Sequence, residues 1–448
     1  MTRVRLFDVA WRLAILALPW QTRWIYQQGM IGGSLWEQGT GATYLSWSFV
    51  LIAVFLSFLV ARLQNREPGT WNREPLQKGG LRFPVPRSRF PIALLVLLIV
   101  SFFTASPTAT SLWWLHVAIL TLFAWTLVRA HVDVTPWFIL SLVPHAALGV
   151  WQYAAQDITG STLLGIATQH PWTSGVSVVE HGLYRVLRAY GGFPHPNILG
   201  GWLAVGLTLL PGLARRSRSN PETLGLAACA VLFATALVLT FSRGAWIAAI
   251  VGLILAAWSV VRTSHADQDR QATWLVLAAT VVAVAAGLAS QWDHVTARFT
   301  PTLRLERWSI EQRSYAVEEG WDAFLARPIV GWGPGSSLVA ITTTRQAKFS
   351  SRLTVPPEPP HYVPLVALIE TGIAGVLAMA YLAWRLLRPA LGRDRWRTSL
   401  PLLSVLGLLM LTDHYLWTLW AGQALVMLVV AMLITHVSMS ERPSIVSS

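Results

Sequence analysis

Apolar runs as long as a membrane span dominate this chain, and only short polar segments separate most of them. A bilayer span requires about 20 predominantly apolar residues, and many runs approach that length. The 448 residues are 54% hydrophobic and only 12% charged, which is more apolar side chain than one soluble core of this size can bury. The sequence therefore predicts an all-α polytopic membrane protein.

We expect about twelve transmembrane helices. They are predicted at residues 9–20, 44–62, 91–103, 111–128, 134–153, 197–214, 222–241, 244–261, 272–290, 362–384, 399–411 and 416–436. The chain then divides into three parts. These are residues 1–290 with the first nine spans and an outer loop at 154–196, residues 291–361 with a large outer loop, and residues 362–448 with the last three spans and a cytoplasmic tail.

The basic residues are distributed unevenly across the predicted membrane. With the N-terminus inside, the inner segments hold 22 of the 34 Lys and Arg but only 9 of the 21 Asp and Glu, whereas the outer segments hold 12 of each sign. This is the positive-inside pattern of membrane proteins. It accounts for the net charge of +13 without nucleic acid, so no nucleic-acid partner is expected.

Segments outside the long spans narrow the interpretation further. The N-terminal segment is interpreted as the first span, because no small-residue cleavage site follows its short apolar part. The single cysteine, Cys229, excludes intramolecular disulfides and cysteine-based metal cages. The inner loop from Arg62 to Phe90 is basic and proline-rich, and we interpret it as a surface loop that touches anionic lipid.

The large outer loop contains a predicted amphipathic helix. Thr300-Pro301 is a typical helix start, and Arg327-Pro328 is a typical end. Arg313 recurs at helical spacing with apolar residues such as Val317, so it lies on the apolar face. A guanidinium there requires an anionic partner. That partner is either a neighbouring carboxylate such as Glu306 or a bound anion.

Three spans are predicted to begin at the outer face, near Pro196-Asn197, Ser242-Arg243 and Pro359-Pro360-His361. A helix N-terminus presents free N–H groups and the positive end of its dipole, which suits a phosphate. If the three starts converge, they form an anion site at the membrane surface. Ordinary helix capping explains any one of them alone.

Each candidate residue also has an ordinary structural interpretation. Arg243 at the end of a span is typical of a snorkelling arginine, and Arg188 is typical of a loop arginine. His195 and Asn197 flank a proline and suit helix capping as well as catalysis. His361 is either a boundary histidine or a general base that works near neutral pH.

The sequence offers weak support for a metal site. Asp267-Gln268-Asp269 has the spacing of a metal-binding pair but falls on the predicted cytoplasmic side, and Asp413-His414 in a short outer turn supports no assignment. The outer segments lack a close carboxylate pair with the usual histidine spacing. Gly-rich phosphate loops, nucleophile elbows and zinc-protease motifs are also absent from the sequence. We predict no metal and no cofactor.

Four motifs follow one another along the chain. They are RAYGGFPHPNILGG, TFSRGAW, the spacing of Arg313 to Trp321 followed by ARPIVGWGPGS, and PHYVPLVALIETGIAG. In this order they resemble the O-antigen ligase family and its Wzy-type polymerase relatives. The resemblance extends from about Arg188 to Gly375, together with the many-span layout. The chain has Tyr362 after His361 where the family pattern often has asparagine.

The resemblance implies a GT-C-like membrane glycosyltransferase in the inner membrane of a bacterium, with its active site on the periplasmic face. Such enzymes transfer a glycan from undecaprenyl or another polyprenyl diphosphate to an acceptor hydroxyl, with inversion and without a metal. The acceptor is lipid A core, another glycan or a protein, and membrane lipids surround the chain. The product belongs to lipopolysaccharide or other cell-envelope polysaccharide biosynthesis.

Carried onto this sequence, the resemblance implies specific roles. Arg243 and Arg313 hold the diphosphate, Arg188 assists them, and His361 activates the acceptor. The helix that carries Arg313 acts as a lid over the lipid headgroup. Guanidinium groups and helix dipoles suit this chemistry, because they neutralise a diphosphate leaving group in place of Mg²⁺. The residues expected to support the site are His195, Asn197, Ser242 and Glu370.

Two alternatives remain open. Within the family, the chain is a polysaccharide polymerase or a protein O-oligosaccharyltransferase. In a different class, it is a transporter or flippase for lipid-linked glycans, which interrupted spans and charges at the bilayer midplane favour. The sequence shows no obviously interrupted span, and its notable arginines and His361 fall at one face.

Overall fold

The computed structural model describes residues 2–31, 33–64, 90–182, 184–217, 219–263, 267–348, 357–392 and 395–440. Most of these residues are helical, as predicted for an all-α chain. The expected lipid-contacting loop from Arg62 to Phe90 lies almost entirely outside the described residues, and so do the side chains of Asp267 and Asp269.

The described helices follow the predicted order of spans closely. In chain order they are α1 (Thr2–Ala17), α2 (Leu45–Gln64), α3 (Phe90–Phe102), α4 (Pro107–Arg129), α5 (Thr135–Ala155), α6 (Pro196–Ala214), α7 (Asn220–Leu239), α8 (Arg243–Thr263), α9 (Asp267–Ser290), α10 (Trp292–Arg298), α11 (Arg304–Ala326), α12 (Ser337–Lys348), α13 (Val363–Leu387), α14 (Trp396–Thr412), α15 (Tyr415–Thr418) and α16 (Trp420–Ser440). Each predicted span coincides with one of these helices.

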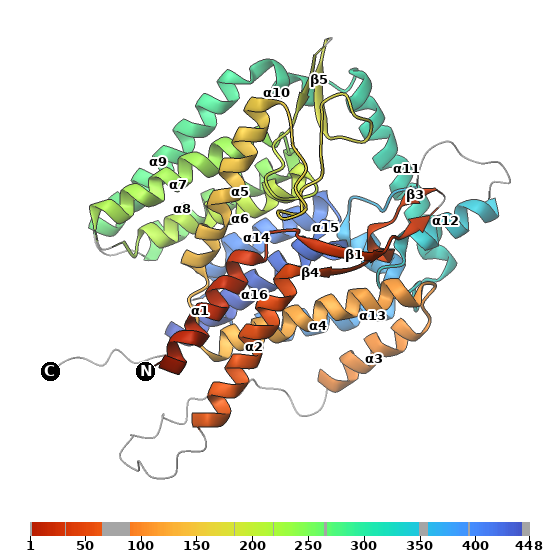
Figure 1. Ribbon diagram of the computed structural model, residues 1–448, viewed down its shortest axis with the longest axis horizontal. Helices are drawn as coiled ribbons and strands as arrows, with labels where there is room; N and C mark the ends of the chain where they lie inside the picture. The colour runs from red at the N-terminus through yellow and green to blue at the C-terminus, as the bar shows by residue number, and fades with distance from the viewer. Residues whose placement is uncertain are drawn as a thin grey trace.

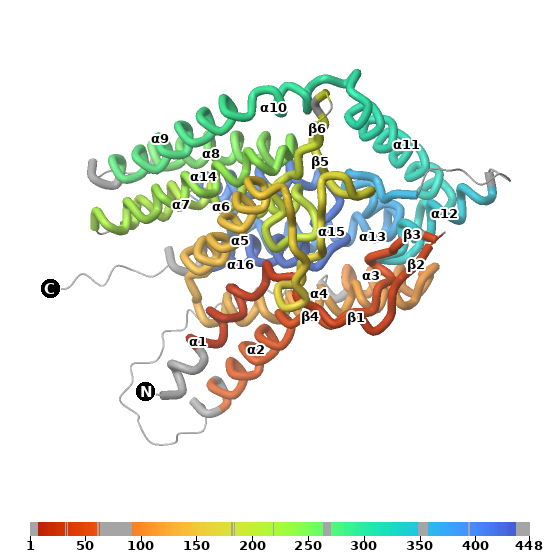
Figure 2. The backbone as a smooth tube through the Cα atoms, turned by 45° about the horizontal axis from the view of Figure 1, so that its top comes forward, coloured from red at the N-terminus to blue at the C-terminus, as the bar shows by residue number. Residues whose placement is uncertain are grey.

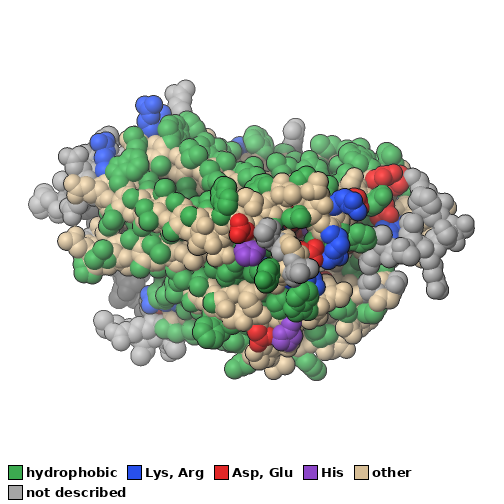
Figure 3. Space-filling model, turned by 90° about the horizontal axis from the view of Figure 1, so that it is seen from above, with side chains coloured by type: hydrophobic (Ala, Val, Ile, Leu, Met, Phe, Trp, Pro, Cys, Tyr) green, Lys and Arg blue, Asp and Glu red, His purple; other side chains and the backbone are tan. Residues whose placement is uncertain are grey.

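Seven helices within the described ranges are long and apolar enough to cross a membrane: α4, α5, α6, α7, α8, α9 and α13. Shorter apolar helices occupy four of the other five predicted span positions, in α2, α3, α14 and α16, and α1 lies at the fifth. Large hydrophobic side chains are widely exposed, for example Phe102 and Leu377. Figure 3 shows a face that is mostly hydrophobic or neutral, with small groups of charged and histidine side chains. The chain is thus a helical polytopic membrane protein, while the count of twelve spans stays a prediction.

Short strands in the outer segments depart from the all-α expectation. β1 (Arg23–Gln27) pairs with β4 (Gly41–Tyr44), β2 (Met30–Ile31) with β3 (Ser34–Leu35), and β5 (Val178–His181) with β6 (Tyr184–Leu187), all antiparallel. A one-turn 3-10 helix, Glu37–Gly39, precedes β4. β5 and β6 are rich in β-branched and aromatic residues, which favour strands. These strand pairs were not predicted from the sequence, because each strand is much shorter than a membrane span.

α6 occupies the centre of the bundle and is buried along most of its length. It packs against α5, α7, α8, α9 and α14, and glycines allow the close approach. A Cβ atom at Gly200 would lie 2.8 Å from that of Ala245 on α8. Trp202 is fully buried and stacks on Phe138 of α5 at 5.4 Å between ring centroids. The core therefore fixes the ends of α6 and its neighbours relative to one another.

α9, α10 and α11 form a continuous arch over one end of this bundle (Figures 1 and 2). The predicted start of α11 at Thr300-Pro301 is wrong, because α11 begins at Arg304 after Leu303 in extended conformation. The Thr300 hydroxyl instead donates to the carbonyl of Thr296 on α10 at 2.8 Å. The predicted end is confirmed, since Arg327 is the residue that follows the last helical turn.

α13 is interrupted at Gly372, which has a φ of 62° and breaks the helical path. The segment at residues 328–333 fills the break with its own backbone. The N–H of Trp332 donates to the carbonyl of Ile369 at 3.0 Å, and that of Gly333 donates to the carbonyl of Glu370 at 2.7 Å. The expectation that no span is interrupted is therefore wrong. A single glycine inside a long apolar run gave no sign of the break.

The glycines of the GWGPG motif explain how this segment reaches the break. Gly331, Gly333 and Gly335 all have positive φ, a conformation in which side chains are strained. A Cβ atom at Gly331 would lie 2.5 Å from the carbonyl oxygen of Glu370. The motif thus packs the backbone of the outer loop closely against α13.

Candidate active site

The three expected helix starts meet at one cavity of about 420 Å³. α6 begins at Pro196, α8 begins at Arg243, and α13 begins at Val363, just after His361. Their N-terminal ends bring backbone N–H groups and positive dipole ends to this cavity. The residues that line it are Asn197, Ser242, Arg243, Gly244, Ala245, Ile247, Arg298, Arg313, Val317, His361, Leu409, Leu411, Thr412, Asp413 and Tyr415.

A chain of hydrogen bonds runs behind the cavity from Arg188 to His361. Arg188 donates from Nε to the carbonyl of Thr240 at 2.6 Å and from Nη2 to Oδ1 of Asn197 at 2.7 Å. Asn197 in turn donates from Nδ2 to Oδ2 of Asp413 at 2.7 Å. Nδ1 of His361 lies 3.3 Å from Oδ1 of Asp413. The network couples a buried guanidinium to an imidazole through one amide and one carboxylate.

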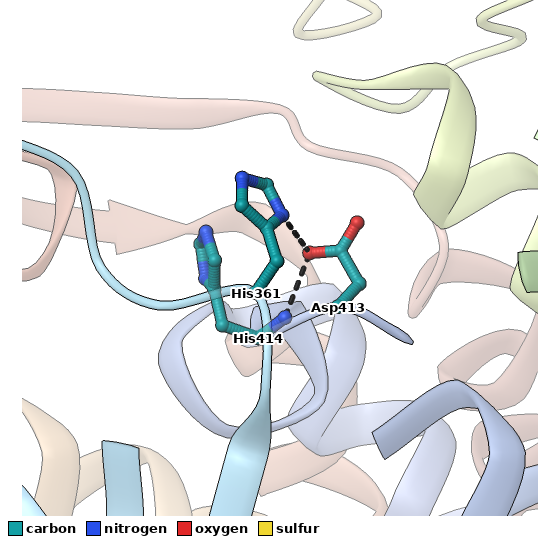
Figure 4. Close-up of side chains that lie close together, drawn as sticks. All are labelled: His361, Asp413 and His414. Carbon is teal, nitrogen blue, oxygen red and sulfur yellow. Dashed lines mark hydrogen bonds and ion pairs between the residues drawn. The ribbon is translucent and has the colours of Figure 1, made fainter. Parts of the chain in front are cut away.

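Asp413 lies beside two neighbouring histidines, and Figure 4 shows its carboxylate directed toward the His361 ring and the His414 backbone. Its Oδ1 contacts His361 and also accepts the backbone N–H of His414 at 2.7 Å. Burial acts to lower the pKa of His361, but the charge of Asp413 and hydrogen bonds to Asp413 and Glu358 outweigh it and raise that pKa to about 9. Burial acts to raise the pKa of Asp413, but His361 holds it well below its ordinary value. At neutral pH the two groups therefore form an ion pair.

Two arginines share one carboxylate beside the cavity. Arg298 forms a buried ion pair with Glu306, and Nη1 of Arg243 lies 3.3 Å from the other oxygen of Glu306. Arg243 also donates to the carbonyl of Arg298 at 2.6 Å. Glu306 therefore pairs with Arg298 and Arg243, and the alternative of a pair between Glu306 and Arg313 is wrong. Because α11 begins later than predicted, Glu306 lies in its first turn and faces α8 and α10.

Arg313 lines the cavity but makes no hydrogen bond or ion pair with any residue that the structure describes. Its positive charge acts to lower the pKa of Arg188 and of His361, so these cations lie close enough to repel one another. Burial is the larger cause for Arg188 and lowers its pKa to about 9, which still leaves it charged at neutral pH. The cavity therefore collects more positive charge than the described carboxylates neutralise.

The expected supporting residues divide into two groups. Asn197 and Ser242 line the cavity. His195 precedes α6, accepts the backbone N–H of Asn197 at 3.1 Å and contacts the Ser177 hydroxyl at 2.8 Å. Burial and the charge of Arg188 lower the pKa of His195 to about 3, so it is a neutral capping residue.

Glu370 lies outside the cavity lining, at the break in α13. Its carboxylate accepts the backbone N–H groups of Gly335 at 2.7 Å and Ser337 at 3.2 Å, and the indole N–H of Trp417 at 2.6 Å. These bonds hold the start of α12 and the GWGPG segment in place. Its contacts thus fit a structural role and not direct contact with a ligand in the cavity.

Two residues of the site were given no role from the sequence, which offered Arg298 no motif and left Asp413 without an assignment. Arg298 lies at the end of α10, outside the quoted motifs, and only its position in the outer loop could have marked it. Asp413 lies just after the predicted span at 399–411. Nothing in the sequence links it to His361, which lies 52 residues earlier. A search for acidic residues at the outer ends of predicted spans, at the same membrane depth as His361, would have found Asp413.

His361, Asp413 and His414 also have the composition of a metal site, with one ligand atom from each within 4.8 Å of the others. The cavity environment fits a metal poorly. A metal requires neutral imidazole, whereas Asp413 favours the charged form of His361, and the arginines nearby repel a second cation. No observation tests the expected absence of a metal directly, so it stays a prediction.

Together, these features define a multi-pass membrane protein with a cationic cavity where three spans begin. The model of one protein family, described as O-antigen ligase (Wzy_C), matches residues 228–380. The match confirms the resemblance to the O-antigen ligase family. It includes Arg243, Arg298, Arg313 and His361, and it ends before Asp413. No curated protein sequence matches the chain.

Proposed function

We propose that the protein transfers a glycan from a polyprenyl diphosphate to an acceptor hydroxyl on the periplasmic face of a bacterial inner membrane, as an O-antigen ligase does. The observation that carries this proposal is the meeting of Arg243, Arg298 and Arg313 with the His361–Asp413 pair around one cavity. The family match to the ligase and polymerase group supports it.

The diphosphate of the donor lies among the arginines in this proposal. Negative charge grows on the diphosphate as the glycosidic bond breaks, and guanidiniums stabilise it without a metal. Arg313, which has no anionic partner among the described residues, faces the anion directly. Arg188 contributes its charge from behind the cavity and holds Asn197 in place.

His361 takes the proton of the acceptor hydroxyl. The acceptor oxygen attacks the anomeric carbon, the bond from that carbon to the diphosphate breaks with inversion, and the proton moves to Nε2 of His361. Asp413 contacts Nδ1, so it orients the ring and stabilises the imidazolium that forms. Because the resting pair is already an ion pair, His361 must first lose a proton to solvent.

The arch that contains α11 acts as a lid over the donor headgroup in this proposal. α11 contributes Arg313 and Val317 to the cavity, and α10 contributes Arg298. The loop at residues 291–361 therefore forms a distinct functional part between the spans at 1–290 and those at 362–448. Lid movement would admit the lipid-linked donor and then exclude water.

The break in α13 is the one observation that favours a transporter of lipid-linked glycans, because broken spans commonly form transport sites. The segment at residues 328–333 already satisfies backbone groups at this break, however, and Glu370 is bonded to the same loop. The break therefore offers little to a substrate, and we favour transfer.

A parallel assay tests the proposal. Purified protein in liposomes would receive a polyprenyl-diphosphate-linked glycan with lipid A core, a free glycan or a protein as acceptor. We expect a new glycosidic bond on lipid A core. A product on the glycan or protein would indicate a polymerase or an oligosaccharyltransferase instead. Translocation of the donor without a new bond would overturn the proposal in favour of transport.

A further inference from the structure

An open groove of about 820 Å³ lies among the segments predicted to be outside the membrane, separate from the candidate active site. Its lining comes from the end of α5, the loop that follows, β6 and α10. These segments bring five rings together, those of Tyr153, His170, Trp172, Tyr184 and His294. We call this surface the aromatic groove.

Two of these rings are exposed over most of their surface. Trp172 is 69% exposed and Tyr184 is 75% exposed. The guanidinium of Arg185 lies 5.4 Å from the centre of the Trp172 ring and holds the indole through a cation–π contact. Exposed rings that line a concave surface are typical of a ligand site, because aromatic side chains supply a large part of the contact area in such sites.

Polar groups lie beside the rings. Nδ1 of His170 lies 2.8 Å from Oδ1 of Asp157, and this contact orients the imidazole so that Nε2 is left to bond with a ligand. The side chain of Arg185 forms no hydrogen bond or ion pair with any residue that the structure describes. The aromatic groove thus combines flat apolar faces with polar groups at their edges.

The aromatic groove adjoins the candidate active site through α10. His294 lines the groove and Arg298 lines the active-site cavity, so one helical turn, or about 6 Å, separates them along α10. The ring centre of Phe241 lies 6.0 Å from that of Tyr153 and 6.3 Å from that of His294. The carbonyl of Phe241 accepts a hydrogen bond from Nε of Arg298 at 3.3 Å. A ligand bound at the arginines therefore has to extend past only one helical turn to reach the groove.

The hairpin of β5 and β6, which contributes to the groove, is fixed to the arch. β5 packs against α10, and both views in Figures 1 and 2 place the hairpin at the same end of the molecule as the arch. Arg304 of α11 donates to Glu180 of β5 at 2.7 Å. The groove is thus attached to the same helices that contribute Arg298 and Arg313 to the active site.

We propose that the aromatic groove binds the glycan of the polyprenyl-diphosphate-linked donor, with sugar rings stacked on Trp172 and Tyr184. A pyranose ring presents a C–H face that packs on an aromatic ring, and the hydroxyls around its edge require hydrogen bonds. This assignment rests on the proposed function. The donor is favoured over the acceptor, because the groove adjoins Arg298 on the side of the diphosphate, whereas His361, which activates the acceptor, precedes α13.

Exposed Trp and Tyr side chains also anchor membrane proteins at the bilayer surface. That role requires only the rings. At the aromatic groove, however, the contact between His170 and Asp157 and the guanidinium of Arg185 lie beside the rings. These polar groups favour a sugar over a lipid.

Equilibrium binding of the free glycan tests this assignment apart from the reaction. Mild acid would release the glycan from lipid-linked donor of native membranes, and calorimetric titration of the full-length protein in detergent would measure its affinity. We expect the Trp172→Ala/Tyr184→Ala double variant to bind about tenfold more weakly than wild type, because it loses both stacking surfaces. Unchanged affinity would overturn the assignment, and rings that only anchor the loop to a bilayer would give that result.

Transfer kinetics provide a second readout. The same double variant should show a KM for the complete donor raised about tenfold, with kcat within about twofold of wild type. A polyprenyl diphosphate that carries a single N-acetylhexosamine is too short to reach the groove, so wild type and variant should use it equally. An equal loss with both donors would indicate a structural effect and overturn the assignment.

A matched control removes the same two ring types from another outer strand. Trp24 and Tyr26 of β1 are 74% and 57% exposed, and neither lines the aromatic groove. The Trp24→Ala/Tyr26→Ala variant should keep the wild-type affinity and KM. Equal losses in the two double variants would reveal a nonspecific effect and overturn the site.

Three further outcomes decide the assignment. If the groove double variant fails to fold, Tyr184→Ala alone should weaken binding about threefold, and unchanged affinity in it would contradict the proposal. Preferential binding of free lipid A core oligosaccharide would assign the groove to the acceptor and overturn the donor. Glycan binding that depends on the groove, without transfer by wild type, would support the groove and contradict the proposed reaction.

Discussion

Two cavities lie at opposite ends of α6, α8 and α14. The outer cavity is the candidate active site, and the inner cavity, of about 730 Å³, is lined in part by Arg215, Arg216 and Arg395. Both are rich in arginine, yet their chemistry differs. The outer cavity combines guanidiniums with His361 and Asp413, whereas the described lining of the inner cavity has arginines and hydroxyls but no imidazole or carboxylate. Arginine alone can bind an anion, but proton transfer requires a group that titrates near neutral pH. The comparison favours the outer cavity as the place for a reaction.

The arginines of the two cavities are also held differently. Arg188 is 5% exposed and bonded to Thr240 and Asn197, and Arg298 is buried against Glu306. At the inner cavity Arg216 is exposed, and its ion pair with Asp133 lies at the surface. Prearranged donors stabilise developing charge most effectively, because they need no rearrangement during the reaction. The buried, hydrogen-bonded arginines of the outer cavity therefore suit catalysis.

Replacing His361 should have the largest effect on transfer. His361→Ala removes the proposed base, so the transfer rate should fall by about 10²- to 10⁴-fold. Binding of lipid-linked glycan should persist, because the arginines remain. The Arg215→Gln/Arg395→Gln variant of the inner cavity provides the comparison and should transfer within about twofold of wild type. Unchanged turnover in His361→Ala would remove His361 from the mechanism.

Arg313→Lys should have the next largest effect. Lysine keeps the charge but lacks the bidentate fork, so we expect a loss of roughly tenfold or more in kcat/KM. Arg307→Lys is a matched control on the same helix, since Arg307 is 69% exposed and pairs with Glu311. Steady-state assays with lipid-linked donor would measure both variants. Equal activity of Arg313→Lys and Arg307→Lys would show that Arg313 has only a structural role.

The pH profile should show a smaller but more specific effect. Asp413 raises the pKa of His361 to about 9, so the neutral base becomes more abundant as pH rises and the transfer rate should increase up to about pH 9. Asp413→Asn removes the charge that opposes burial, so this increase should move toward lower pH. Rates measured from pH 6 to 10 would show the shift.

The opposite trend would change the role of His361. A wild-type rate that falls steadily between pH 7 and pH 9 would mean that the imidazolium acts as a further cation for the diphosphate. Donor binding by Asp413→Asn serves as the control, because a misfolded variant would lose binding at every pH.

Much of the fold could be predicted because membrane spans are encoded locally. Each predicted span was recognised as a long apolar run, and a helix lies at each of these positions. Prolines in the first helical turn, such as Pro196, also predicted helix starts correctly. The start of α11 and the break at Gly372 could not be predicted in this way. Both depend on contacts with distant segments, with α10 for Thr300 and with residues 328–333 for the break.

The candidate site was only partly predictable for the same reason. The motifs identified Arg188, Arg243, Arg313 and His361, and the cavity brings three of these into its lining while Arg188 lies behind it. Glu370 belonged to the same motif as His361 but serves the packing of the outer loop. Motif membership did not separate the two roles, because His361 precedes α13 whereas Glu370 lies at the break within it, so the two side chains face different partners.

The sequence alone determined that this chain crosses the membrane many times, and it predicts which side carries the positive charge and which arginines and histidine face outward. Those properties follow from composition and from spacing along the chain. Only the tertiary structure decided that Asp413 pairs with His361, that Glu306 pairs with Arg298 and Arg243, and that Arg313 is left to face the cavity. The physical reason is that ionic partners are chosen by distance in space, and helix packing sets that distance.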